Sequence, residues 1–233
     1  MKRFWQTAAP ALGPQGWAIL LDGKPLRLPG GPELQVHSPG LADAIAAEWQ
    51  AAGQEVGGEM SYADVPLTRL AGTAQERIAG DPAAVALEIA RYAESDLLCY
   101  RAEHPPALAE RQAQAWQPWL DWAASRYGAR LRMVAGVIHV PQESAALAAL
   151  AGVVGGYDAL RLAALGVAVP VLGSLVLGLA MAEGCLSAAA AHELAALDEL
   201  YQEGFWGVDA AAALRRAQVL DDLNVASRVF ALV

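Results

Sequence analysis

The first sixty or so residues alternate short apolar runs with turn-forming residues, a pattern typical of short β-strands. In GWAILLDGKPLRLPGG, two apolar runs flank Asp22-Gly23, and an Asp-Gly pair between such runs is the strongest short-range signal for a β-hairpin. The segment ELQVHS offers a third strand, in which Leu34 and Val36 alternate with polar neighbours. We therefore expect strands within residues 3–37.

After this segment the spacing of apolar residues changes to the helical period. Ser38 followed by Pro39 is a typical helix start, because the serine oxygen caps free amides and proline fits the first turn. We expect a helix near residues 39–52, with one apolar face formed by Leu41, Ile45 and Trp49.

Helical spacing then continues to the end of the chain. Asp81 with Pro82 starts one helix, and a longer helix ending at Gly128 contains Pro118, which should kink it. The segment ARLRMVAGVIHVPQ interrupts the helices as an extended stretch, and helices resume from about Glu143. The expected fold class is α+β, with a small strand-rich N-terminal domain (residues 1–65) containing one helix, followed by a larger all-helical C-terminal domain (residues 66–233).

One uncharged stretch, residues 162–182, is long enough to raise the question of a membrane span. Gly166 and Pro170 interrupt it, so the continuous helix should run from about Pro170 to Gly184. Such a helix of roughly fourteen residues is about 21 Å long and cannot cross a hydrocarbon core of about 30 Å. We expect no membrane insertion and predict that this helix is the most buried element of the helical domain.

Composition narrows the functional classes. The chain of 233 residues carries a net charge of −9 and no basic cluster, which argues against nucleic-acid binding. Two cysteines form no disulfide or zinc pattern, and the N-terminus lacks a secretory signal, so we expect a cytoplasmic location. The four histidines lack metal-ligand spacing, and no glycine motif for a nucleotide is present. We expect neither a metal nor a cofactor.

Cys99 is the one candidate nucleophile. It lies near Asp96 and His104 in the sequence, so a cysteine-dependent hydrolase is the alternative function. A cysteine that follows two leucines is also typical of a small buried apolar residue.

A charged helix face near the C-terminus is a second candidate. The segment SAAAAHELAALDELYQEG begins with the capping residue Ser187 and places Glu199 nearly opposite its apolar stripe, beside His192 and Glu203. The stripe comprises Ala190, Leu194, Leu197 and Tyr201. The spacing alone is also compatible with an ordinary solvated face.

Several sequence blocks resemble, in order, those of the ATP synthase assembly chaperones, known from mitochondria and alphaproteobacteria. These blocks are RFW, LDGKPLRLP, LADAIAAEW, VPLTRLAGTA, SDLLCYR, LGSLVLGLAMAEGCLS and LDELYQEGFWG. The resemblance covers essentially the whole chain. It implies a binding protein without catalysis, which holds the unassembled alpha subunit of the catalytic head and prevents its aggregation until it joins the beta subunit.

The resemblance also implies a contact site. An acidic residue in the block matching LDELYQ is functionally important in the family, and Glu199 is the best match, with Asp198 as the adjacent alternative. Glu203, on the same helix face as Glu199, completes the expected partner-binding set. Mitochondrial members carry a presequence, whereas here the first block begins at residue 3, which favours a bacterial cytoplasmic member. The sequence carries no signal for an oligomeric state.

Overall fold

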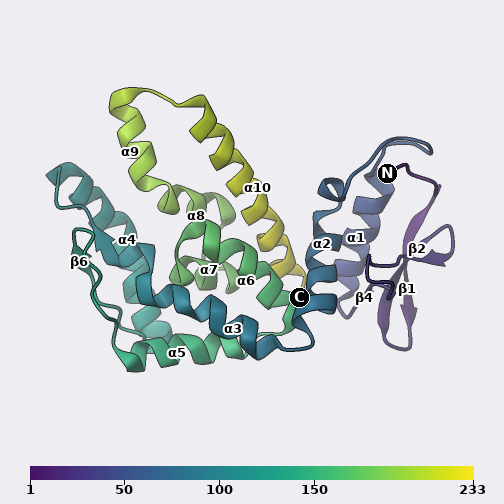
Figure 1. Cartoon of the computed structure of the whole chain (residues 1–233), viewed down its shortest axis with the longest axis horizontal. Helices are drawn as coiled ribbons and strands as arrows, with labels where there is room; N and C mark the ends of the chain where they lie inside the picture. The colour runs from purple at the N-terminus through teal and green to yellow at the C-terminus, as the bar shows by residue number, and fades with distance from the viewer.

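The computed structural model describes residues 1–233 and begins with a small antiparallel sheet (Figure 1). Its strands are β1 (Ala8–Gly13), β2 (Gly16–Leu21), β3 (Lys24–Pro25) and β4 (Gln35–Val36). The central strand is β2, which pairs with each of the other three. The predicted turn at Asp22-Gly23 joins β2 to β3, and both residues have positive φ, 48° and 79°. The predicted strands and this hairpin are therefore confirmed.

The longer hairpin between β1 and β2 was missed by the sequence analysis. Its turn lies between Gly13 and Gly16, which face each other at the end of the ladder. The strand β1 has the sequence AAPALG, which lacks alternation and contains Pro10. Proline cannot donate to a ladder and is therefore confined to edge strands, which is the place that β1 occupies.

Helix α1 (Pro39–Ala51) packs against this sheet and begins as predicted. Its Ser38 Oγ accepts a hydrogen bond from the Leu41 amide at 3.3 Å. The predicted apolar face is buried, together with two alanines beside it: Leu41, Ala42, Ile45, Ala46 and Trp49.

The block RFW ties the N-terminus to the end of α1. Arg3 is only 4% exposed, and its guanidinium donates to backbone carbonyls that include those of Gln50 at 2.7 Å and Gln54 at 3.1 Å. The Trp5 indole N–H donates to the carbonyl of Trp49 at 3.0 Å. Carbonyl oxygens that satisfy a buried cation explain Arg3, and the indole bond to Trp49 together with burial explains Trp5.

The rest of the chain is mostly helical. Its α-helices are α2 (Pro66–Thr73), α3 (Pro82–Ala90), α4 (Pro106–Tyr127), α5 (Ser144–Gly155), α6 (Ala159–Leu172), α7 (Leu175–Ala182), α8 (Ala188–Ala195), α9 (Leu197–Trp206) and α10 (Ala210–Leu232). Short 3-10 or π turns occupy Tyr62–Asp64, Ala74–Ile78, Arg91–Ser95 and Leu97–Cys99. The α+β class is confirmed, and the caps at Asp81 and Gly128 stand where the sequence placed them.

The C-terminal part is not strictly all-helical, which corrects the prediction. Two short strands, β5 (Tyr100–Arg101) and β6 (Val134–Ala135), form a parallel pair. The second strand lies in the segment that the sequence analysis read as extended. Two-residue strands need a tertiary partner to form, so their pairing leaves no periodic signal in the sequence.

The uncharged stretch forms two helices, and its break lies at Gly173 rather than at Pro170. Helix α6 runs through both Gly166 and Pro170 and ends at Gly173, whose φ is 62°. Ser174 then caps α7 by accepting from the Leu177 amide at 3.1 Å. A left-handed glycine followed by a capping serine is a stronger stop signal than an exposed proline in the last turn.

The prediction that this region is the most buried is confirmed for α7. Every residue from Leu175 to Met181 is buried. The helix lies so close to α6 that a Cβ atom on Gly178 would stand 2.5 Å from Val169 Cγ2. None of the helices combines the length and the apolar character needed to cross a membrane.

Helix α2 and the end of α10 connect the sheet region to the larger helical lobe (Figure 1). The carboxylate of Glu48, on α1, accepts from the Leu67 amide at 3.1 Å and lies 3.7 Å from Arg228 of α10. Ser38 Oγ donates to the carbonyl of Leu232. One continuous apolar core therefore extends from Trp5 to the last turns of α10. The boundary at residue 65 stays a prediction.

Candidate functional site

The charged segment near the C-terminus forms two helices rather than the single helix expected. Helix α8 ends at Ala195, and α9 begins at Leu197 after one residue with φ −88° and ψ 8°. Because the break changes the helix direction, one helical wheel cannot relate His192 to Glu199. The apolar stripe itself is correct, since its members are buried or pack against the core: Ala190, Leu194, Leu197 and Tyr201.

Glu199 and Glu203 are joined by an arginine from α10. Arg216 donates to Glu199 Oε2 at 3.0 Å and to Glu203 Oε1 at 2.6 Å. The side chain of Glu199 is 62% exposed, whereas those of Arg216 and Glu203 are 13% and 17% exposed. The bonds to Glu203 and Glu199 raise the pKa of the Arg216 guanidinium. Glu199 is therefore an exposed carboxylate with a fixed position.

Asp198 has a different environment, since it anchors α9 to α4. Its Oδ1 accepts from Gln112 Nε2 at 2.7 Å. Gln112 is 1% exposed, and its own Oε1 accepts from the Ala102 amide at 2.7 Å. The structure thus separates the two adjacent acidic residues: Asp198 faces the lobe and Glu199 faces solvent.

A buried arginine supports the same anchor. Arg101 Nη1 donates to the carbonyl of Gln112 at 2.6 Å, and its guanidinium lies 5.1 Å from the Trp116 ring centroid. The Trp116 indole donates to the carbonyl of Leu194 at 2.9 Å. Burial lowers the pKa of Arg101, and its Nε and Nη2 have no protein partner. The sequence analysis missed Gln112, Arg101 and Arg216, because each meets its partners only through long-range packing.

The turn between α9 and α10 exposes large apolar side chains. We define the apolar tip as four of these residues, Phe205, Trp206, Val208 and Leu214. Gly207, with φ 84°, ends α9, and Asp209 caps α10 by accepting from the Ala211 and Ala212 amides at 2.8 Å and 3.2 Å. The Asp209 cap therefore marks the start of α10 directly after the turn.

Cys99 lacks the surroundings of a nucleophile. It is 1% exposed, and burial raises the pKa of its thiol to about 12, so the thiol is protonated at neutral pH. His104 is exposed, and His139 hydrogen-bonds Tyr100 instead. The nearby Asp96 is fully buried and accepts from the Leu98 and Val176 amides at 3.1 Å and 3.0 Å. These contacts make Cys99 and Asp96 part of the packing against α7.

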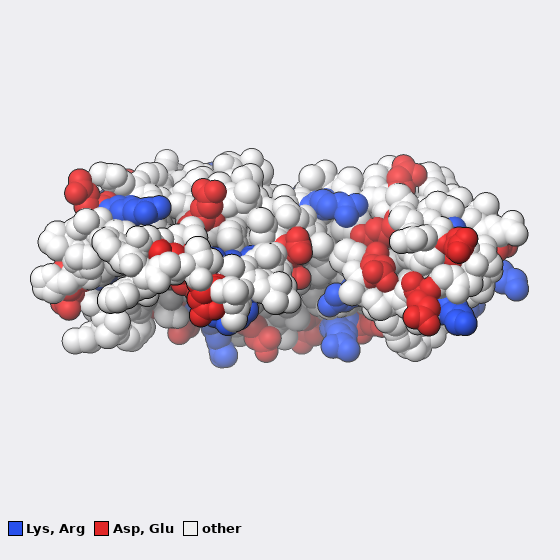
Figure 2. All heavy atoms as spheres, turned by 90° about the horizontal axis from the view of Figure 1, so that it is seen from above, with Lys and Arg blue, Asp and Glu red and all other residues white.

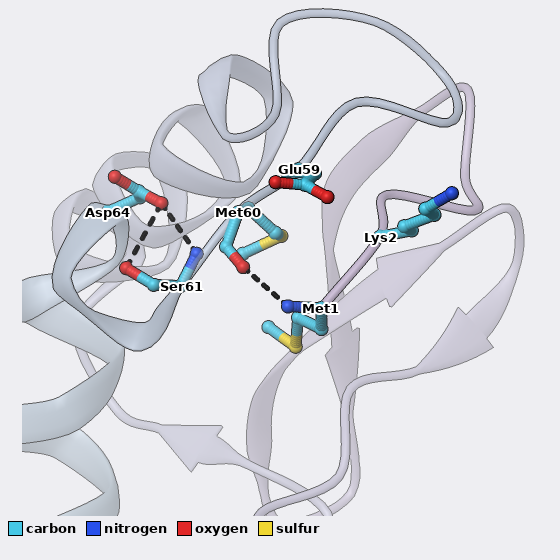
Figure 3. Close-up of a pocket in the computed structure, with 6 residues that line it drawn as sticks. All are labelled: Met1, Lys2, Glu59, Met60, Ser61 and Asp64. Carbon is cyan, nitrogen blue, oxygen red and sulfur yellow. Dashed lines mark hydrogen bonds between the residues drawn. The ribbon is translucent and has the colours of Figure 1, made fainter.

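A surface hollow beside the N-terminus is lined by Met1, Lys2, Glu59, Met60, Ser61 and Asp64 (Figure 3). The Met1 amino group donates to the Met60 carbonyl at 2.7 Å, and the Ser61 amide donates to Asp64 at 2.7 Å. Figure 3 shows the Lys2 side chain extending away from the other lining groups. The Met1 amino group and the Asp64 carboxylate therefore take part in local hydrogen bonds. Elsewhere, no three His, Cys, Asp or Glu side chains converge in a way that could hold a metal ion.

A family model matches the first half of the chain, and solved structures match nearly all of it. The family model described as ATP12 chaperone protein matches residues 2–124. The crystal structure of Atp12 from Paracoccus denitrificans is 42% identical, covers 99% of this chain and 97% of that chain, and superposes with a TM-score of 0.94. An aspartate-to-lysine mutant of the P. denitrificans protein is 41% identical, with the same coverage and a TM-score of 0.93.

A third solved structure, a candidate chaperone from Agrobacterium tumefaciens, is 42% identical. The match covers 99% of this chain and 85% of that one, with a TM-score of 0.93. A family model that spans more than half of the chain, and relatives above 40% identity over nearly its full length, lead to one conclusion: this protein belongs to the ATP12 chaperone family.

Proposed function

We propose that this protein is an assembly chaperone for ATP synthase, which binds the unassembled alpha subunit of the catalytic head and prevents its aggregation until it joins the beta subunit. Membership of the ATP12 chaperone family is the observation that supports the proposal most strongly. We place this activity in the bacterial cytoplasm and assign it no catalytic step.

The physical need for such a protein follows from the architecture of a ring. A subunit destined for a ring exposes large and partly apolar interfaces until its neighbours arrive. A binding partner that covers one of these interfaces must be displaced later. Its contact should therefore combine a modest apolar area with charged groups, because charge complementarity gives specificity and fast association more than raw affinity.

Glu199 is the proposed centre of this contact, with Glu203 as its neighbour. Glu199 combines high exposure with a fixed position beside Arg216, so it pays little entropy on binding a basic group of the partner. Asp198 contributes indirectly, since its bond to Gln112 sets the position of α9.

The Glu199→Lys variant tests this assignment against purified alpha subunit. The substitution removes the bond from Arg216 to Glu199, but Arg216 keeps its bond to Glu203, so we expect a melting shift of less than about 4 °C. It turns an attraction into a repulsion at the contact, and we expect binding to weaken at least about tenfold. Titration calorimetry of the wild-type and variant proteins measures both affinities.

Glu88→Lys is the matched control. Glu88 is also an exposed helical glutamate, it lies on α3, and it makes no ion pair. The two variants have the same net charge, so a general charge effect would weaken both equally. Equal binding by Glu199→Lys and the wild type would remove Glu199 from the interface.

A further inference from the structure

The apolar tip is unusually exposed for a folded domain. Trp206 is 88% exposed, Val208 71%, Phe205 70% and Leu214 62%. The ring of Phe205 touches Tyr201 at a centroid distance of 5.1 Å, but the tip otherwise contributes nothing to the core. Clustered exposed aromatic residues mark interaction sites, because indole and phenyl rings supply much of the energy at the centre of interfaces.

The tip lies at the edge of the helical lobe, where α9 turns into α10 (Figure 1). Figure 2 looks down onto this edge and shows the helical lobe covered mainly by uncharged atoms, with acidic and basic groups between them. At the two ends of the turn, the Gly207 amide donates to the carbonyl of Glu203 and Asp209 caps α10. The four apolar side chains of the tip are exposed on either side of it.

The charges beside the tip indicate the chemistry of its partner. Glu199 and Glu203 pair with Arg216, and Asp209 interacts with Arg215 and Arg216, so these three carboxylates and two guanidinium groups leave an excess of one negative charge. Arg216 is shared between Glu199 and Glu203, so it neutralises only one of these carboxylates. The exposed remainder is Glu199. A complementary partner surface is apolar and carries a basic side chain.

We propose that the apolar tip is the hydrophobic half of the chaperone's binding site, and that it receives an apolar segment of the unassembled alpha subunit whose neighbouring basic side chain pairs with Glu199. This inference rests on the proposed function and extends it from one carboxylate to a surface. The two halves lie on one helix, since α9 carries Glu199 in its first turn and Trp206 at its end.

A second copy of this chain fits the tip less well. In a two-fold symmetric dimer the same patch lies on both subunits. The acidic groups beside one tip would then face those of the other, and like charges across an interface oppose association. A partner of opposite charge has no such penalty.

The test replaces the two aromatic residues of the tip in the full-length protein. The double variant Phe205→Ser/Trp206→Ser should retain the wild-type melting temperature within a few degrees, because both side chains are largely exposed. Its affinity for purified alpha subunit should fall at least about tenfold. Titration calorimetry measures the affinity, and sedimentation equilibrium of each protein alone gives its oligomeric state.

A matched control exists in the loop after β6. Val137 and Ile138 are 93% and 78% exposed, so Val137→Ser/Ile138→Ser removes exposed apolar surface away from the α9–α10 turn. Loss of binding in the tip variant alone supports the inference. Equal loss in both variants, or unchanged binding of the tip variant, overturns it and leaves the proposed function standing.

Two further results of these measurements would show whether the binding function or the role of the tip is wrong. If the wild type does not bind alpha subunit, the proposed function fails and the inference fails with it. If the wild type is dimeric and the tip variant is monomeric, the tip is a self-association surface and the inference is wrong.

Discussion

At the scale of single residues, Asp96 shows what burial does to a carboxylate. Burial raises its pKa from the ordinary 3.8 to about 6, although backbone amides including those of Val176 and Leu98 favour the charged form. A raised folded-state pKa means that the folded protein binds the proton more tightly than the unfolded chain. The resulting stabilisation is fully present below about pH 4 and is lost as the pH rises through about 6.

This linkage predicts a pH-dependent difference between the wild type and Asp96→Asn. The variant should be less stable at pH 5, because an amide cannot accept from as many backbone donors. Between pH 5 and pH 8 the wild type loses about 1.4 kcal/mol that the variant does not lose, because a folded-state pKa of about 6 leaves part of the full effect below pH 5. Urea unfolding at both pH values measures the difference in unfolding free energy, which should become smaller at pH 8. A constant or growing difference would contradict the assignment.

Single residues also show where sequence reasoning stops. Because Cys99 and Asp96 are neighbours along the chain, the sequence was compatible with a catalytic cysteine. The structure argues against this role, because burial raises the pKa of the Cys99 thiol and Asp96 accepts a hydrogen bond from the Val176 amide of α7. The spacing of residues in the sequence does not show how deeply an individual side chain is buried. Arg216 could not be paired with Glu199 in advance, since the two residues lie on different helices.

At the scale of elements, capping residues were reliable signals, whereas Gly166 and Pro170 did not interrupt their helix. Ser38 and Asp81 start their helices as predicted, because a capping side chain acts within three residues of itself. The break between α8 and α9 falls at Ala196 without a glycine or proline to mark it. Packing of Leu197 and Asp198 against the lobe is the only visible cause.

The turn at Gly173 gives a prediction at this scale. Its φ of 62° is a left-handed conformation that other residues adopt at a cost, and a Cβ there would meet only Leu97 at 3.8 Å. Gly173→Ala should therefore lower the unfolding free energy by about 1 kcal/mol through the backbone alone. Thermal or urea unfolding of the purified variant checks this value.

For Gly166→Ala, in the helix that Gly173 ends, we expect a gain in stability instead of a loss. Gly166 lies inside α6 with ordinary helical φ, and a Cβ there would stand 4.0 Å from its nearest neighbour, Ile89. Alanine should raise the unfolding free energy by roughly 0.5 to 1 kcal/mol. If both variants lose the same amount of stability, packing around α6 and not backbone conformation determines the effect of the added methyl group. The explanation from the left-handed φ of Gly173 would then be wrong.

At the scale of the whole molecule, the lobes were predictable but their joining was not. The change from strand spacing to helical spacing after residue 37 was visible in the sequence, and α1 begins at Pro39. The contacts that join the two parts connect distant segments: Glu48 with Arg228, and Ser38 with Leu232. Such pairs leave no local pattern, and the same is true of the α9–α10 surface, which depends on two helices meeting.

The function that we propose is that this protein keeps unassembled alpha subunit of ATP synthase from aggregating. Light scattering of purified alpha subunit during dilution from denaturant tests it directly, with and without an equimolar amount of this protein. We expect that the wild type suppresses the scattering at this ratio, and that Glu199→Lys suppresses it far less than Glu88→Lys. Scattering that is unchanged by the wild-type protein would contradict the claim.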